Sequence, residues 1–149
     1  FERSGIQRSA VGKRILEEML QFAKETNLNG QPLSKKPEIR NGLADLAIEV
    51  EVSRMLSYRI GYLQSQGEVF NKEASVGKAF GSEMQQRLYR MGMSLLGMYG
   101  MLYKGSKWSP LQSRIQRGFL SSFSSTIAAG TSEIQRNVIA TRGLGLPRG

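Results

Sequence analysis

The sequence predicts an all-α protein: an antiparallel helical bundle of the four-helix up-and-down type with a short extra helix at its C-terminal end. Three observations predict this fold. Apolar residues recur at intervals of three and four over several long stretches, no stretch alternates apolar and polar residues as a half-buried strand would, and the connecting loops are short. We expect the 149 residues to form one domain, residues 1–149, which is long enough to bury a sizeable core.

The first two helices are expected on either side of a loop. The first extends from near Glu2 to about Lys24, and Asn, Gly and Pro residues then predict a loop up to Pro37. Its apolar positions follow helical spacing: Val11, Ile15, Met19 and Phe22. The second helix ends near Gln66 and Gly67. Its expected core-facing positions are Leu43, Leu46, Ala47, Val50, Val52, Met55 and Leu56.

The third helix has the clearest apolar stripe, because its apolar residues alternate spacings of four and three. The stripe consists of Met84, Leu88, Met91, Leu95, Met98 and Leu102, and we interpret Met84, Met91 and Met98 as core residues. Glycines loosen its end, and a second loop covers Lys104 to Pro110. A shorter helix around Leu111 to Ile127 and a final one from Ser132 to about Thr141 complete the predicted bundle.

Composition excludes several kinds of catalytic site. The chain has no Cys and no His, so it contains no disulfide, no Cys- or His-ligated metal centre, no thiol nucleophile and no Ser-His-Asp arrangement. We therefore expect no metal site. Any catalysis must depend on carboxylates, hydroxyls, Lys, Arg or Tyr, or on a bound cofactor.

The charge balance points to an anionic partner. Lys and Arg number 21 against 12 Asp and Glu, a formal net charge of +9. Nucleic acid, an acidic membrane surface and a phosphate-bearing cofactor all satisfy this balance. Basic residues gather near the two loops as Lys35, Lys36, Arg40, Lys104, Lys107, Arg114 and Arg117, and either solvated loops or phosphate contacts would explain them.

No apolar stretch approaches the ~20 residues that cross a bilayer, and no signal peptide opens the chain. We therefore expect no membrane partner. The first residue, Phe1, falls inside a predicted helix, so the chain is expected to be part of a longer polypeptide.

The start of the last predicted helix is a candidate binding site. Ser132 and Gln135 have the spacing of a capping box, and Gly130 allows close approach of a ligand to the backbone. A helix N-terminus offers free N–H groups and positive dipole, so it can hold a phosphate or a polarised cofactor atom. An ordinary helix cap is the alternative interpretation.

Several segments together resemble one family. The most specific is Thr126–Asn137, which contains Gly130-Thr131-Ser132-Glu133-Ile134-Gln135-Arg136 and closely resembles the end of acyl-CoA dehydrogenases. Phe1-Glu2-Arg3, ahead of Val11-Gly12, resembles the opening of their C-terminal helical domain. The segments Gly30–Leu33, Arg40–Asp45, Ala74–Lys78 and Gly143–Arg148 also fit, so the resemblance covers nearly the whole chain.

The resemblance implies α,β-dehydrogenation of an acyl-CoA thioester. In this family a Glu removes the α-proton and the β-hydrogen passes as hydride to N5 of FAD, which needs a carboxylate in a dry pocket and donors on the thioester carbonyl. Many members carry the base at the position of Ala129, which cannot take a proton. A second branch carries it on the first helix of this domain, where Glu2 matches. We therefore expect Glu2 to be the base, with Arg3 in a supporting electrostatic role.

The resemblance also assigns the cofactor contacts. Gly130, Thr131 and Gln135 are expected to touch FAD. Acyl-CoA is the implied substrate, an electron-transfer flavoprotein the implied electron acceptor, and a homodimer, homotetramer or mixed tetramer the implied assembly. The phosphates of FAD and CoA then account for the basic charge without nucleic acid, and the implied location is the cytoplasm, or the mitochondrial matrix in a eukaryote. The isolated 149 residues are expected to be inactive and to bind FAD poorly.

Three departures from the family pattern favour an alternative. The loop that usually carries Arg and then Phe-Gly has Thr26 and Asn29-Gly30, and the Gln expected late in the third helix is Ser94. In the family these residues reach the FAD of a neighbouring subunit. Their loss implies a rearranged adenosine site, or a non-catalytic partner subunit in a mixed assembly.

Overall fold

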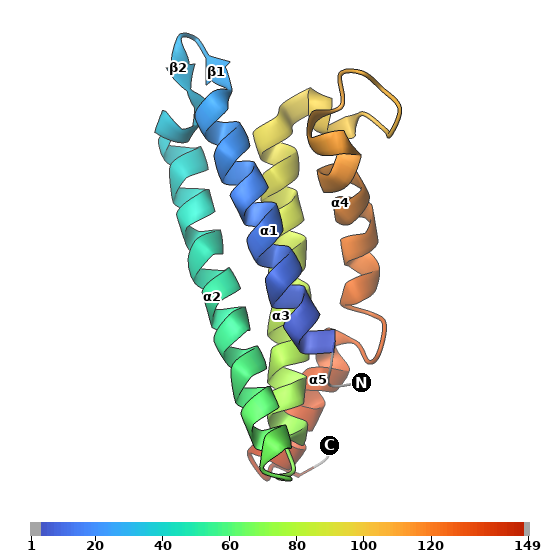
Figure 1. Ribbon diagram of the computed structural model, residues 1–149. Coiled ribbons are helices and arrows are strands. Elements are labelled where there is room, and N and C mark those ends of the chain that lie inside the picture. The colour runs from blue at the N-terminus through green and yellow to red at the C-terminus, as the bar shows by residue number, and fades with distance from the viewer. Residues whose placement is uncertain (1–3, 148–149) are drawn as a thin grey trace.

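The computed structural model describes residues 4–147, and it contains the predicted antiparallel bundle. The helices are α1 (Ser4–Glu25), α2 (Pro37–Ser65), α3 (Asn71–Leu96), α4 (Arg114–Ser125) and the short α5 (Ser132–Val138). Consecutive long helices alternate in direction, and α3 contacts α1, α2, α4 and α5 (Figure 1). The predicted all-α class and the short C-terminal helix are therefore confirmed.

Short turns of other helical types join these elements. Three 3₁₀ turns cover Leu33–Lys35, Gly97–Met101 and Pro110–Ser113, and a π-type turn over Ile139–Gly143 extends α5. Leu111, Gln112 and Ser113 have positive φ angles, so α4 begins at Arg114 and not at Leu111.

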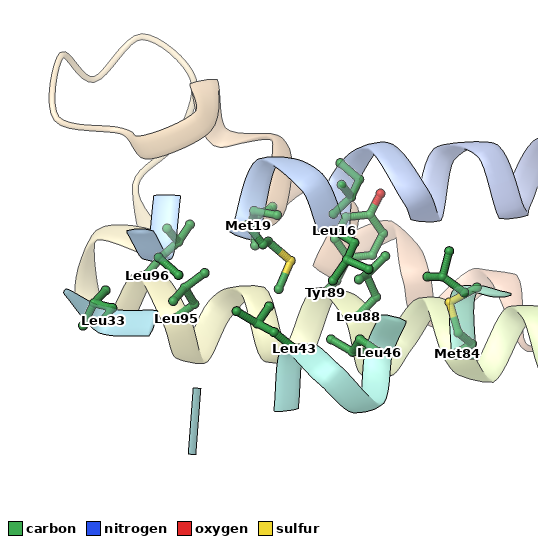
Figure 2. Close-up of a cluster of buried hydrophobic side chains, with 14 residues drawn as sticks. Leu16, Met19, Leu33, Leu43, Leu46, Met84, Leu88, Tyr89, Leu95 and Leu96 are labelled. Carbon is green, nitrogen blue, oxygen red and sulfur yellow. The ribbon is translucent and has the colours of Figure 1, made fainter. Parts of the chain in front are cut away.

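The core lies between α3 and the helices around it. Ile15, Met19, Met84, Leu88 and Ile115 are almost completely excluded from solvent, and Figure 2 shows the leucines and methionines of this cluster meeting from several helices. The predicted core position of Met84 is confirmed, and the half-buried Met91 packs against the same cluster. Burial of these side chains from water is the main stabilising contribution to the bundle.

The predicted core position of Met98 is wrong, because this side chain is 85% exposed. α3 ends at Leu96, and Gly97 has φ 54°, a left-handed conformation that stops the helix. The spacing of apolar residues continues beyond Gly97, but the helix that would turn them towards the core does not.

The prediction that Ala47, Val52 and Met55 of α2 face the core is also wrong. Val52 and Met55 are 40% and 49% exposed, and Ala47 is exposed as well. α1 and α3 cover one side of α2 (Figure 1), so the apolar residues on its other side face solvent.

One local element departs from the expected absence of sheet. Asn27–Leu28 (β1) pairs antiparallel with Gln31–Pro32 (β2), so that Asn27 lies opposite Pro32 and Leu28 opposite Gln31. Asn29 and Gly30 between them have φ angles of 54° and 79°, as a two-residue type I′ hairpin turn requires. The Asn-Gly pair is the sequence signal for this hairpin.

Candidate functional site

The loop between α4 and α5 forms the candidate site, and backbone conformation shapes it. Ala129 and Gly130 both have positive φ, 57° and 93°, which reverses the chain before α5 begins. The φ angle of Gly130 favours glycine, and a Cβ there would lie 2.7 Å from Nε2 of Gln135, so the end of that flexible side chain would have to move.

The cap of α5 is one residue earlier than predicted. Thr131 is the N-cap, and its Oγ1 accepts a 3.3 Å hydrogen bond from the backbone N–H of Ile134. Ser132 already lies in the helix, so the capping box predicted for Ser132 and Gln135 is wrong. Instead, Nε2 of Gln135 donates a 3.1 Å hydrogen bond to the carbonyl of Ala129 and closes the loop. The buried Oγ of Ser132 has no hydrogen-bond partner among the described residues.

One side of α3 anchors this loop. Nζ of Lys78 donates a 2.6 Å hydrogen bond to the carbonyl of Gly130, and Nε2 of Gln86 donates one of 3.0 Å to Oγ1 of Thr126. Arg136, in α5, forms a 2.6 Å ion pair with Glu83 of α3. These contacts fix where Gly130 and Thr131 lie relative to the bundle.

A carboxylate lies at the N-terminus of α5. The Glu133 side chain accepts hydrogen bonds from its own backbone N–H and from the Thr131 hydroxyl, and these bonds hold the pKa of the carboxyl below its ordinary value. Glu133 is exposed. A phosphate that uses this helix terminus would therefore displace Glu133.

A pocket of about 550 Å³ lies beside α5 and the π-type turn that follows it. Its lining combines apolar, amide, hydroxyl and guanidinium groups: Ile134, Asn137, Val138, Ala140, Thr141, Arg142 and Pro147. The volume lies within the range of small-ligand sites, but the lining is more polar than is usual for them. A phosphate-bearing cofactor such as FAD requires hydrogen-bond donors and cations, and the residue types present near α5 fit that group: Arg142 lines the pocket, and Thr131 and Gln135 carry donors that now bond Glu133 and Ala129.

Gly130, Thr131 and Gln135, the predicted FAD contacts, lie together at the start of α5, and their binding role stays a prediction. Glu2 and Arg3 lie outside the described residues. Among the described residues of α1, Gly12 lies against Met84 of α3. Six residues before Met84 is Lys78, and six residues before Gly12 is the first turn of α1, so both are at the same level of the bundle.

The three departures lie at the other end of the bundle. Thr26 and Asn29 follow the end of α1, and Ser94 is exposed near the end of α3. From Lys78 to Ser94 the rise along α3 is about 24 Å. These residues therefore do not belong to the site that contains Gly130.

Two of the basic residues have partners within the chain. Arg114 forms an ion pair with Glu18 of α1, and Nζ of Lys107 lies 5.1 Å from the ring centre of Trp108. Within residues 4–147 no cluster of acidic side chains could hold a metal ion. No helix of that described part is long and apolar enough to cross a membrane.

Sequence reasoning missed the anchoring residues Lys78, Glu83 and Gln86. Their partners are 36 to 53 residues away in the chain, so no local pattern marks them. Only the packing of α3 against α4 and α5 reveals their role.

Comparison with known proteins identifies the family. The family model for the acyl-CoA dehydrogenase C-terminal domain matches residues 2–144 of this sequence. The chain therefore belongs to the acyl-CoA dehydrogenase family and corresponds to that domain. The probable acyl-CoA dehydrogenase YngJ of Bacillus subtilis is 33% identical over 140 residues, which are 93% of this chain and 35% of YngJ.

Solved structures of similar fold support the same family assignment. The ChsE4-ChsE5 complex from Mycobacterium tuberculosis is similar at a TM-score of 0.86 and 30% identity, over 95% of this chain and 36% of that one. The Tcur3481-Tcur3483 steroid ACAD is similar at a TM-score of 0.87 and 26% identity, and the match covers 99% of this chain and 38% of that one. The chain spans about a third of the length of the relatives that it matches.

Proposed function

We propose that this chain is the C-terminal helical domain of an FAD-dependent acyl-CoA dehydrogenase, which converts an acyl-CoA thioester to its α,β-unsaturated product. The observation that carries the proposal is the loop at the start of α5, where Gly130, Thr131 and Gln135 are anchored to α3 by Lys78. Family membership supplies the reaction class.

Gly130, Thr131 and Gln135 are the proposed FAD contacts. The missing side chain at Gly130 lets a ligand approach the backbone, Thr131 offers a hydroxyl and Gln135 an amide. Bound FAD supplies the acceptor for the β-hydrogen, which leaves as hydride. The bundle contributes position, because Lys78 anchors the loop that carries these groups, although the Thr131 hydroxyl and the Gln135 amide would have to exchange their bonds to Glu133 and Ala129 for bonds to the ligand.

Glu2 is the proposed base that takes the α-proton, and Arg3 supports it electrostatically. The level of the first turn of α1, which matches that of Lys78 and Gly130, supports a carboxylate that reaches the same site. Ala129, at the other position used in the family, has only a methyl group. A carboxylate in a dry pocket becomes a stronger base, because desolvation disfavours its charged form.

The proposed substrate is an acyl-CoA and the proposed electron acceptor an electron-transfer flavoprotein. The net charge of +9 suits partners that carry phosphates and acidic surfaces. An oligomer located in the cytoplasm, or in the mitochondrial matrix of a eukaryote, completes this proposal.

A second candidate function is that of a partner subunit in a mixed assembly. Thr26, Asn29 and Ser94 replace the family residues that reach a neighbouring subunit's FAD. Ser94 lies about 24 Å along α3 from Lys78, which anchors the Gly130 loop, and Thr26 and Asn29 follow the end of α1. The solved relatives include a complex of two proteins, ChsE4 and ChsE5. Such a chain would contact one flavin at the end of the bundle that carries Gly130. It would contribute few contacts to a neighbouring subunit's flavin at the end that carries Thr26, Asn29 and Ser94.

The test uses the full-length polypeptide that carries this chain, under anaerobic conditions with a panel of acyl-CoAs. Bleaching of the visible flavin band is followed for the wild type, for Glu2→Gln and for Glu17→Gln, an exposed control in α1. We expect the wild type and the control to bleach, and Glu2→Gln to bind FAD without bleaching. Equal bleaching by Glu2→Gln would place the base elsewhere, and a wild type that holds no flavin would support the partner-subunit function.

A further inference from the structure

A second pocket, of about 300 Å³, lies where α2 ends and α3 begins. The π-type turn after α5 packs on α3 and contributes a further wall. Figure 1 shows the end of α2, the start of α3 and α5 at the same end of the bundle. The lining combines aliphatic side chains, two cations and one carboxylate: Leu56, Arg59, Lys72, Glu73, Val76, Ile139, Gly143 and Leu144. None of these residues lines the larger pocket beside α5 or belongs to the Gly130 loop.

Glu73 is a buried carboxylate whose hydrogen bonds are incomplete. The residue is 8% exposed, and its buried Oε2 accepts no hydrogen bond from the described residues. Its Oε1 lies 3.6 Å from Nη2 of Arg59 and 3.7 Å from Nζ of Lys72, which is longer than a hydrogen bond. A buried acceptor without a donor is rare in folded proteins and calls for a functional explanation.

Arg59 and Lys72 give the pocket an excess of positive charge. Their side chains are 64% and 54% exposed, and Glu73 balances only one of the two charges. Both cations are attracted to the carboxylate and are held beside the pocket, but their donors are not used in bonding it. The pocket therefore favours an anion with a single charge.

The wall that contains Ile139 and Gly143 is a turn of unusual geometry. It is a π-type turn, which is rare in proteins and often occurs at functional sites. A 3.1 Å hydrogen bond from the backbone N–H of Leu144 to the carbonyl of Ile139 closes it. A Cβ at position 143 would lie 3.3 Å from Cβ of Lys72, so glycine leaves room for this side chain. The turn thus adds aliphatic surface to that supplied by α2 and α3.

We propose that this pocket binds a small aliphatic monocarboxylate, with its carboxylate on Arg59 and Lys72 and its hydrocarbon chain against the aliphatic side chains. Charge selects the headgroup, because an ammonium would face two cations and a second negative charge would face Glu73. Size selects the chain, because the volume is at the lower limit of small-ligand sites and suits about six carbons. The proposal does not depend on the flavin chemistry, and its test requires no bound FAD.

The chemistry of the ligand is tested on the full-length polypeptide by saturation-transfer difference NMR, which detects weak binding. The probes are hexanoate, hexylamine and acetate. We expect hexanoate to bind, hexylamine to bind at least tenfold more weakly, and acetate, which lacks the chain, to show no saturable binding. Tighter binding of hexylamine than of hexanoate would mean that Glu73 governs the pocket, and it would overturn the proposal.

Photolabelling tests the location. A hexanoate that carries a diazirine in its chain should label peptides that contain Leu56, Val76 or Ile139, as identified by mass spectrometry. Arg59→Gln should reduce this labelling at least tenfold, whereas Arg90→Gln, which replaces an exposed arginine of α3, should leave it unchanged. Val76→Phe fills the pocket and should abolish the labelling, and circular dichroism melts check that each variant folds. Labelling confined to other regions, such as an acyl-CoA site, or equal labelling of the two arginine variants would contradict the proposal.

Discussion

The ammonium group of Lys78 lies 2.6 Å from the carbonyl oxygen of Gly130, although the two residues are 52 positions apart in the chain. This hydrogen bond joins the first half of α3 to the loop that presents Thr131 and Gln135. It is half-buried, and its donor carries a charge, so it is among the stronger single contacts of the site. The position of the proposed flavin contacts therefore depends on α3 as much as on α5.

Replacing Lys78 tests this dependence. Lys78→Met keeps most of the side-chain volume and removes the charged donor, so we expect about 1–2 kcal/mol of unfolding free energy to be lost. FAD retention should fall several-fold, and amide hydrogen exchange of the Gly130 loop should accelerate. The exposed Lys13→Met is the control and should change neither quantity. Unchanged exchange at the loop in Lys78→Met would show that the hydrogen bond does not hold it.

Gly130 and Gly30 allow backbone strain to be separated from a binding role. Both have positive φ, 93° and 79°, but a Cβ at 130 would meet Gln135 whereas a Cβ at 30 would meet nothing within 4 Å. Gly130→Ala and Gly30→Ala should each lose about 1 kcal/mol of unfolding free energy through φ strain. Only Gly130→Ala should also weaken FAD binding, measured by equilibrium dialysis. Equal flavin affinity in the two variants would remove Gly130 from the cofactor site.

Helical periodicity predicted the bundle well, because the spacing of apolar residues reports directly which helix face avoids water. Periodicity gave wrong core positions where an apolar residue does not pack in the bundle core. The stripe of α3 continues past Gly97, which ends the helix, and Met98 is exposed. In α2, apolar residues occupy both sides, and only the packing shows that Met55 faces outwards while Leu46 faces the core.

The site was predictable in part. The run from Gly130 to Gln135 predicted a binding role for the loop before α5, and that role stays a prediction. The N-cap depends on backbone angles that place Thr131, not Ser132, outside the helix. Lys78 could not be assigned, because its partner is fixed only by the packing of α5 on α3. The roles of Glu2 and Arg3 remain predictions.

The ion pair between Glu18 and Arg114 joins α1 to α4 and can be compared with an exposed pair on the same carboxylate. Arg114 is 33% exposed at its side chain and Arg14 70%, and both bond Oε1 of Glu18. Because Oε2 of Glu18 is buried without a hydrogen bond, Arg114→Met should lower the unfolding free energy by about 1–2 kcal/mol. Arg14→Met should change it by less than about 0.5 kcal/mol. Urea denaturation measures both, and equal losses would contradict a special role for Arg114.

Tyr89 predicts how stability responds to alkaline pH. Burial raises the pKa of its hydroxyl above 10.0, and the opposing effects of Gln85 and Arg114 are smaller. Above about pH 10 the unfolded chain loses this proton while the folded protein keeps it, so stability is complete below that pH and falls above it. Tyr89→Phe should therefore show a smaller fall in Tm between pH 9 and about 11 than the wild type. The exposed Tyr62→Phe should follow the wild type.

The close contact between α3 and α4 at Gly118 leads us to expect the largest loss of unfolding free energy among these variants. A Cβ added at Gly118 would overlap the ring of the buried Tyr89, whereas one added at Gly61, in α2, would meet nothing within 4 Å. Gly118→Ala should therefore lose about 3 kcal/mol of unfolding free energy through overpacking. Gly61→Ala should gain up to about 1 kcal/mol, because alanine favours a helix.

A double-mutant cycle assigns that loss to the pair. If the ring of Tyr89 is what an alanine at 118 strikes, Gly118→Ala should cost much less in a Tyr89→Ala background, where the ring is absent. We expect a coupling free energy of at least about 1 kcal/mol from urea denaturation of the four proteins. Simple additivity would mean that helix α4 shifts to admit the methyl group, and that the spacing of α3 and α4 is not set by this glycine.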